Sequence, residues 1–315
     1  MKIKTPYYNW QTYNFGSISL CMIMRDNAKT LSRCLNSVKG LVDEIIIVDT
    51  GSKDNSIDIA VSHGAQVYQD PWQDDFARPR NIGIEKARGN WVLIMDPDEM
   101  LLQKDHDDLK WLTGTKKFDA FWLTTRNYGP FNYRMEYKIV GKAADPLGKY
   151  EGFMPSSKTR FFRNGVGIRF EGCWHELADW YIRRYKLRQW ASPIPIHHWT
   201  HEVSQTSLEA KIAFYLKMGE KKVREWPRHG QARWELATAQ MNAGLRAEAC
   251  KSLATAIRLG FNRVDMYYSI SKCQKFLDSK EKANLAFEKG VCKQYPALTH
   301  IHAGKRPLNA LLDAL

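Results

Sequence analysis

The segment W-V-L-I-M-D-P-D-E, residues 91–99, runs an apolar stretch directly into three carboxylates. Asp96 and Asp98 share one turn, which Pro97 stiffens because its ring fixes φ. Like charges this close repel each other, and a hard divalent cation between them removes the repulsion. We therefore predict that Asp96 and Asp98 hold Mn²⁺ or Mg²⁺ together with phosphate oxygens and water. An acidic turn without a metal is the alternative, because such turns are common after strands.

A histidine and a carboxylate stand side by side in R-F-E-G-C-W-H-E, at His175 and Glu176. Either side chain can take a proton from a hydroxyl nucleophile, which is the task of a general base. The structural alternative is that Glu176 caps a helix or pairs with an arginine such as Arg183.

Three histidines follow in P-I-P-I-H-H-W-T-H, at His197, His198 and His201. A neutral imidazole nitrogen can add one directional ligand to a set of oxygens around a cation. If the segment is extended, His197 and His198 point to opposite faces. Only one of this adjacent pair is therefore expected to face a given site.

These residues must be positioned by strands and helices, which the apolar pattern predicts. Strands are expected at 17–24, 45–48, 65–68 and 91–95, alternating with helices over 31–38, 57–61 and about 75–87. Strands that are apolar throughout and alternate with helices predict a parallel sheet covered on both faces. Ligands of such sheets bind beyond the carboxyl ends of the strands, where Asp49 and Asp96 lie.

Further candidates fall at the same edge. Arg80 and Asn81 open a helix, and a helix N-terminus with a guanidinium suits a diphosphate or the edge of a base. Asp49 offers a carboxylate to a nucleoside. Lys53 and Arg25 follow the second and first strands and could line the same crevice, or they could be exposed loop side chains.

The second half of the chain shows a different pattern of residue types. Further strands are expected at 121–125, 159–162 and 194–198, with a mobile surface segment over the Gly- and Pro-containing residues 129–155. After His201 the composition predicts helices alone. We therefore expect a catalytic domain over residues 1–203 and a small all-helical domain over 204–315.

The helical region contains a weak repeat with a spacing of 34 residues. Small residues recur where two helices must approach closely, and Pro296 ends the second copy; this resembles tetratricopeptide repeats. Two interpretations stay open, a helical hairpin packed on the catalytic domain and a platform for dimerisation or acceptor docking. The matched positions are Gly244, Ala249, Leu253 and Ala256 with Asp278, Ala283, Phe287 and Gly290.

Composition limits the class of protein. The 315 residues are 44% hydrophobic, enough for a real core, and no apolar run approaches the roughly 18 residues of a membrane span. The N-terminus lacks the apolar core of a signal peptide, so we expect a cytoplasmic protein. The six cysteines form no C-x-x-C pair, so neither a zinc site nor a disulfide framework is expected. The net charge of +13 favours anionic partners such as nucleotide phosphates, glycolipids or nucleic acid.

The order of V-D-T-G-S-K-D, R-N-x-G-x-x-x-A-R-G-N-W and D-P-D-E resembles a family 2 glycosyltransferase with the nucleotide-sugar-binding GT-A fold. The opening strand and helix, in S-L-C-M-I-M-R-D-N-A-K-T-L, resemble that family as well. The resemblance implies that Asp49 contacts uracil or ribose, and that Arg80 contacts the base or the diphosphate. It also implies that Asp96 contacts the ribose and metal-bound water, and that Asp98 binds the cation bridging both phosphates.

The H-E pair and the I-H-H-W segment resemble a branch of that family with lipopolysaccharide-core and peptide-modifying members. In this resemblance Glu176 is the general base, His175 orients it or contacts the acceptor, and His198 completes the metal shell. The activity implied is inverting transfer of a hexose from a nucleotide-diphosphate sugar, UDP-linked, to an acceptor hydroxyl.

Other hypotheses remain open from sequence. A nucleotidyltransferase would carry a Gly-rich basic loop after the first strand, which M-R-D-N-A-K lacks. An inactive binding or scaffold protein is disfavoured by the intact D-P-D and H-E pairs. The favoured acceptor is an anionic cell-envelope saccharide or glycolipid, which would allow peripheral contact with the inner face of the membrane. A peptide, a protein or a modified DNA base is the alternative acceptor.

Overall fold

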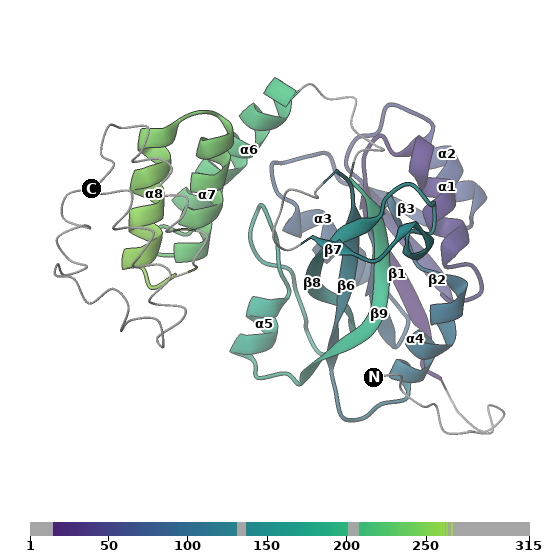
Figure 1. Ribbon diagram of the computed structural model, residues 1–315. Helices are drawn as coiled ribbons and strands as arrows, with labels where there is room; N and C mark the ends of the chain where they lie inside the picture. The colour runs from purple at the N-terminus through teal and green to yellow at the C-terminus, as the bar shows by residue number, and fades with distance from the viewer. Residues whose placement is uncertain (1–14, 131–136, 201–207, 262, 264–265, 267–315) are drawn as a thin grey trace. The chain divides into compact units, whose positions relative to one another are not determined.

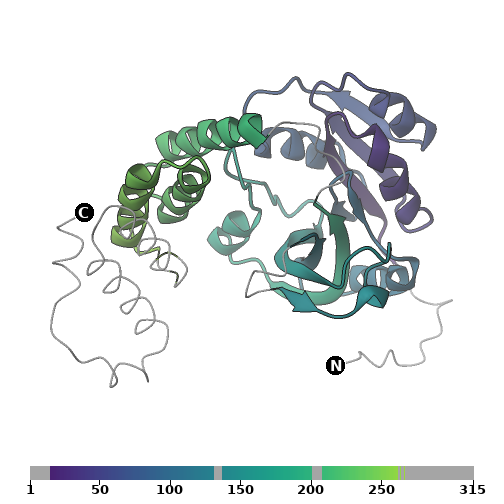
Figure 2. The ribbon, with the colours of Figure 1, turned by 45° about the horizontal axis from the view of Figure 1, so that its top comes forward.

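The computed structural model describes residues 15–130, 137–200, 208–261, 263 and 266. The chain divides into two compact units, Met1–Ser204 and Gln205–Leu315. Figures 1 and 2 show an α/β unit built on one twisted sheet, and a unit made of helices.

The sheet of the first unit has the strand order β3-β2-β1-β4-β8-β6-β9-β5, with β7 paired to β8. Its first half is parallel throughout, and each strand ends at the same edge. The central strands β1, β2 and β4 are largely apolar because helices cover both faces, whereas the edge strand β3 is partly exposed. The four strands are β1 (Ile18–Met24), β2 (Glu44–Asp49), β3 (Gln66–Gln69) and β4 (Trp91–Ile94).

The second half of the sheet is mixed. Strand β8 runs antiparallel to both β4 and β6, whereas β9 runs parallel to β6 and antiparallel to β5. The carboxyl ends of β6 and β9 therefore reach the same edge as those of β1, β2 and β4. The strands are β5 (Glu99–Met100), β6 (Ala120–Tyr128), β7 (Lys138–Ile139), β8 (Gly152–Arg163) and β9 (Gln189–Trp199).

Two cores hold the helices to the sheet. On one face α1 (Ala28–Ser37), α2 (Ser56–Ser62) and α4 (His106–Thr113) pack with Trp91, whose ring stacks on Phe161 at 4.9 Å. On the other face α3 (Ala77–Lys86) and α5 (Asp179–Arg184) cover the sheet through Ile84, Phe162 and Ile182. Figure 1 shows α1 and α2 together on one side of the strands and α3 on the other.

The A-R-G-N-W segment has a structural role. The Glu44 carboxylate accepts hydrogen bonds from the backbone N–H groups of Arg88 (2.6 Å) and Gly89 (3.0 Å) and from the Ser19 hydroxyl. A Cβ on Gly89 would lie 2.6 Å from Ser19 Oγ. Glycine is therefore required where the segment entering β4 crosses β1.

The α/β fold expected from sequence is confirmed, with one correction. The segment 129–155 is not a loop throughout, because β8 begins at Gly152 and β7 pairs with it. Asp145 is buried and accepts hydrogen bonds from Trp199 Nε1 and from the backbone N–H of Leu147 and Tyr150. The polar side chains and glycines of this segment predict an exposed loop. The buried carboxylate of Asp145 instead accepts the backbone N–H groups of the turn that follows it.

The helical unit contains α6 (Leu208–Glu225), α7 (Gly230–Asn242) and α8 (Arg246–Arg258). The first copy of the predicted repeat lies at the α7–α8 hairpin, where Gly244 makes the turn (φ 77°) and Ala249, Leu253 and Ala256 are buried. The second copy lies outside the described residues. None of the described helices combines the length and the apolar character that crossing a membrane requires.

Candidate active site

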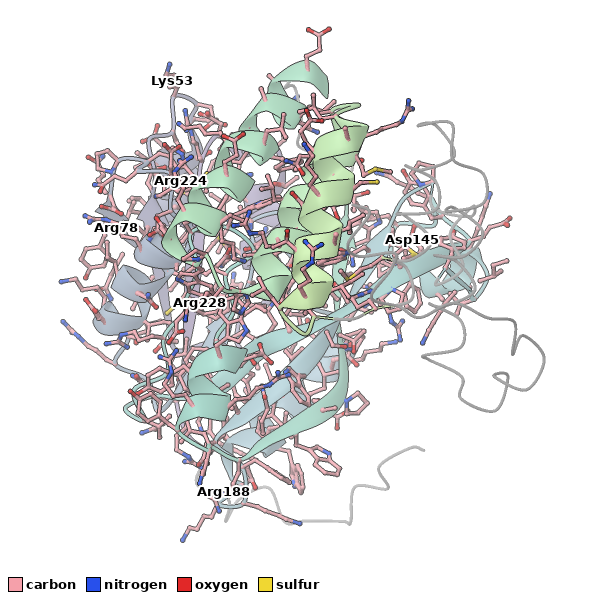
Figure 3. All side chains as sticks on the ribbon, turned by 90° about the vertical axis from the view of Figure 1, so that its left-hand side faces the viewer. Lys53, Arg78, Asp145, Arg188, Arg224 and Arg228 are labelled. Atoms are coloured by element: carbon pink, nitrogen blue, oxygen red, sulfur yellow. The ribbon has the colours of Figure 1, made fainter. Side chains whose placement is uncertain are left out.

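The loops after β1 and β2 are joined to each other at the carboxyl edge of the sheet. Asp26 has a positive φ of 53°; its carboxylate accepts one hydrogen bond from the Lys53 backbone N–H (2.6 Å), and its own N–H donates to the Ser52 hydroxyl. Arg25 is half exposed beside Asp26. The Lys53 side chain projects outward in Figure 3, at the opposite end of the unit from Arg188. The nucleotide roles of Lys53 and Arg25 stay predictions.

Asp49 closes the end of β2. Its carboxylate is buried and accepts hydrogen bonds from the backbone N–H groups of Gly51 (3.0 Å) and Ser52 (3.1 Å) and from the Ser52 hydroxyl. Gly51 has a φ of 109°, which favours glycine. Asp49 thus shapes the turn that follows it, and its contact with a nucleoside stays a prediction.

Arg80 links the acidic turn to the H-E pair. Its Nε donates to Glu176 Oε1 (2.6 Å) and its Nη2 donates to Asp96 Oδ1 (2.8 Å), with the guanidinium nearly buried. Nη1 is buried and has no hydrogen-bond partner. Helix α3 begins at Ala77, so Arg80 and Asn81 lie inside the helix rather than opening it as expected, because Pro79 is tolerated in a first turn. Asn81 instead pairs in both directions with the backbone of Phe170.

Arg160 of β8 forms the other side of the acidic turn. It lies 3.3 Å from Asp96 and 2.8 Å from Glu99, which is buried. Burial opposes ionisation of Asp96, but the charges of Arg80 and Arg160 hold the pKa of Asp96 well below its usual range. Burial raises the pKa of Glu99, and Asp96 adds to the rise while Arg160 opposes it. Glu99 also accepts the Asp96 N–H (2.8 Å) and so fixes the turn.

Asp98 and His198 face each other, with 3.3 Å between Asp98 Oδ2 and His198 Nε2. His198 Nδ1 lies 2.8 Å from Asn127 Oδ1, and the Asn127 amide donates to Met154 O (2.9 Å), which fixes its orientation. Nδ1 is therefore the donor, and Nε2 is directed at Asp98. Burial alone would lower the pKa of His198, but the hydrogen bond and charge of Asp98 raise it above its ordinary value.

A carboxylate oxygen and an oriented imidazole nitrogen fit a hard divalent cation that takes its other ligands from phosphate and water. Among the residues that the structure describes, no three His, Cys, Asp or Glu side chains gather into a metal-binding group. Asp96 is turned toward the two arginines instead. The metal roles of Asp96, Asp98 and His198 stay predictions.

Two further candidate histidines lie in different environments, one exposed and one buried. His175 is exposed with a φ of 47°, a strained conformation next to Glu176. His197 is buried, lies 2.8 Å from the Tyr128 hydroxyl and stacks on its ring. Burial lowers the pKa of His197 to about 4, so it is a neutral core residue. His201 lies outside the described residues.

Sequence reasoning missed Arg160, Lys158 and Asn127. The two basic residues in K-T-R, residues 158–160, were an available signal, because charged side chains beside an apolar strand are seldom buried unless they are paired. Glu176 does pair with an arginine, but with Arg80 rather than with Arg183. The cysteines that the structure describes, Cys21, Cys34, Cys173 and Cys250, are buried.

This sheet, with its charged groups gathered at the carboxyl edge, defines the GT-A class of glycosyltransferase domain. The family model "Glycosyl transferase family 2" matches residues 19–174, and the chain belongs to that family.

Among known relatives, a TPR repeat-containing protein of Synechococcus elongatus is 32% identical over 191 residues, 58% of this chain and 42% of that protein. The glycosyltransferase SunS of Bacillus subtilis is 21% identical over 229 residues, 72% of this chain and 50% of that protein. The chain thus spans about half the length of these curated relatives. The crystal structure of S. aureus TarS 1-349 with UDP-GlcNAc has a TM-score of 0.50 at 13% identity, covering 87% of this chain and 92% of that one.

Proposed function

We propose that this protein transfers a sugar from a nucleoside-diphosphate donor to an acceptor hydroxyl, with inversion and with a divalent cation. The observation that carries the proposal is the continuous chain Glu176–Arg80–Asp96, which joins a proton acceptor to the donor turn through contacts of 2.6 Å and 2.8 Å. A single displacement requires both elements in one crevice, because the acceptor oxygen attacks as the diphosphate leaves.

Glu176 is the proposed general base. Its Oε1 is held by Arg80, and within the described residues its Oε2 has no hydrogen-bond partner. The carboxylate is therefore oriented by one oxygen and can accept the acceptor proton with the other. Asp96 is proposed to hold the ribose side of the donor, and its pairing with Arg80 and Arg160 keeps it ionised.

A divalent cation at Asp98 and His198 would supply positive charge for the diphosphate of the donor. Asn127 orients His198 for this role, and Glu99 fixes the turn that carries Asp98. The proposed donor is a UDP-sugar, the ligand named for the TarS structure, and the proposed acceptor is a cell-envelope saccharide.

The test is mass spectrometry of products from a panel of nucleotide sugars with Mn²⁺ and with saccharide, peptide and DNA acceptors. Asp98→Ala should lose donor hydrolysis and transfer together, whereas the control Asp58→Ala, on an exposed position of α2, should retain both. Undiminished turnover by Asp98→Ala would defeat the proposal. A wild-type protein that turns over no donor in the panel would instead indicate a binding or scaffold protein.

A further inference from the structure

Strand β8 directs a second basic residue into the crevice beside Arg160. Lys158 and Arg160 flank Thr159 of β8, at the point where the pairing of β8 with β6 shifts its register. Both line a pocket that also contains Arg80 and Glu176, with Phe170 and Ile94 on its apolar side. The pocket therefore presents three cationic side chains next to the proposed base.

Two of these three cations are already neutralised. Arg80 is paired with Asp96 and Glu176, and Arg160 is paired with Asp96 and Glu99. Each guanidinium thus shares its charge between two carboxylates. The positive charge of each arginine is therefore already balanced by carboxylates of the protein, and a negatively charged ligand gains less from it.

Lys158 differs from both arginines. It is exposed to solvent and forms no ion pair within 4.0 Å in the part of the chain that the structure describes. Partial burial and the charge of Arg160 lower the pKa of Lys158, and the carboxylates of Asp96, Glu176 and Glu99 oppose this shift. Lys158 thus lines the pocket of the proposed base, and within the described residues its ammonium forms no ion pair.

We propose that Lys158 is a catalytic residue that binds the diphosphate of the donor as it leaves. This assignment rests on the proposed function. In the step, the bond between the anomeric carbon and the diphosphate oxygen breaks, and its electron pair stays on that oxygen. The acceptor oxygen forms the new bond to carbon, and its proton goes to Glu176. Lys158 donates a hydrogen bond to the departing diphosphate and keeps its own proton.

A lysine suits this task better than the neighbouring arginines. Its ammonium is a compact charge on a flexible stem, so it can follow an oxygen that moves during the reaction. Removal of one donor from a developing oxyanion lowers kcat by about 100- to 1,000-fold. Because this interaction strengthens as the bond breaks, KM should change little.

The experiment compares Lys158→Met and Lys158→Arg with the control Lys39→Met, an exposed lysine after α1. Transfer kinetics give kcat and KM, and calorimetry with Mn²⁺ gives the affinities for UDP and for UMP. We expect Lys158→Met to lose about 100-fold in kcat with KM within about threefold. UDP should bind about tenfold more weakly while UMP binding is unchanged, because only UDP carries the second phosphate. Lys158→Arg should recover part of both losses, and Lys39→Met should match the wild type.

A kcat within threefold of wild type and unchanged UDP affinity in Lys158→Met would overturn this assignment alone. An equal loss of UDP and UMP affinity would also overturn it, since that pattern indicates a distorted site rather than a lost phosphate contact. A wild-type protein that neither binds UDP nor transfers a sugar would overturn the proposed function, and this assignment with it.

Discussion

Arg80 Nε lies 2.6 Å from Glu176 Oε1, a contact between residues 96 positions apart in the chain. The same guanidinium reaches Asp96, so one side chain of α3 holds the proposed base and the donor turn in a fixed relation. A buried arginine shared by two carboxylates is costly to disturb, because each carboxylate loses a charge-assisted hydrogen bond.

Arg80→Lys should lower the transfer rate by at least about 100-fold, since an ammonium keeps the charge but cannot hold two carboxylates in the planar geometry of a guanidinium. Steady-state kinetics with a competent donor and acceptor would measure the loss. The matched control is Arg78→Lys on the same helix, whose half-exposed guanidinium pairs with Asp70. A rate for Arg80→Lys equal to that of Arg78→Lys would contradict the role given to Arg80.

Asn127→Ala should weaken Mn²⁺ binding by about 10- to 100-fold in the presence of UDP, although Asn127 would touch no metal. The amide oxygen fixes His198 Nδ1, and loss of such an outer contact frees the imidazole to rotate. Mn²⁺ titration followed by electron paramagnetic resonance measures the affinity. Thr124→Ala on the same strand, which removes an exposed contact to Ser157, is the control. Equal Mn²⁺ affinities in the two variants would argue against an ordered His198 ligand.

Glu44→Gln should change how stability depends on pH. Burial opposes ionisation of Glu44, but hydrogen bonds from Ser19, Arg88 and Gly89 hold the pKa of Glu44 below its usual range. A carboxyl with a lowered folded pKa contributes stability that is complete above its unfolded value of about 4.3 and is lost as the pH falls through the folded value. The variant keeps an acceptor oxygen, so we expect a loss of about 1 kcal/mol at pH 7 that shrinks below pH 4.3.

Urea unfolding at several pH values measures this difference in the free energy of unfolding. Glu85→Gln serves as the control, because Glu85 is more than half exposed and lies 3.5 Å from Arg169. An exposed pair of this kind contributes about 0 to 1 kcal/mol. A Glu44→Gln difference that stays constant down to acid pH would contradict the lowered pKa.

The substitutions Gly89→Ala and Gly83→Ala should change the free energy of unfolding in opposite directions. A Cβ on Gly89 would meet Ser19 Oγ at 2.6 Å and Ser19 N at 2.8 Å, so Gly89→Ala should destabilise the fold by about 1–3 kcal/mol. A Cβ on Gly83, inside α3, would make ordinary contacts of 3.7 Å. Gly83→Ala should therefore stabilise the fold by about 0.5–1 kcal/mol through helix propensity. Thermal or urea unfolding of both variants checks the sign, and the same sign for both would refute the packing argument.

The sequence alone predicted the parallel half of the sheet and the ends of its strands. Apolar runs such as residues 45–48 and 91–95 are local signals, because a strand covered on both faces is apolar at every position. Their termination in Asp49 and Asp96 followed from the sequence, as did the H-E pair. The α/β class and the family were predicted correctly for this reason.

The partners of these residues were decided by tertiary structure. Asp98 meets His198 because β5 pairs with β9, and His198 meets Asn127 because β9 pairs with β6 in a particular register. The apolar pattern of one segment does not show which distant strand it will pair with, so these contacts follow only from the folded sheet.

The same limit explains the pairing of Glu176 and the position of Lys158. The sequence supplied a carboxylate, arginines and a basic strand, all of which could have faced solvent. Only the tertiary placement of α3 and of strand β8 joined Arg80 to Glu176 and brought Lys158 to the same pocket. Residue type thus determined which chemistry was available, and long-range strand pairing determined which groups could perform it together, because side chains far apart in sequence meet only when the backbone brings them together.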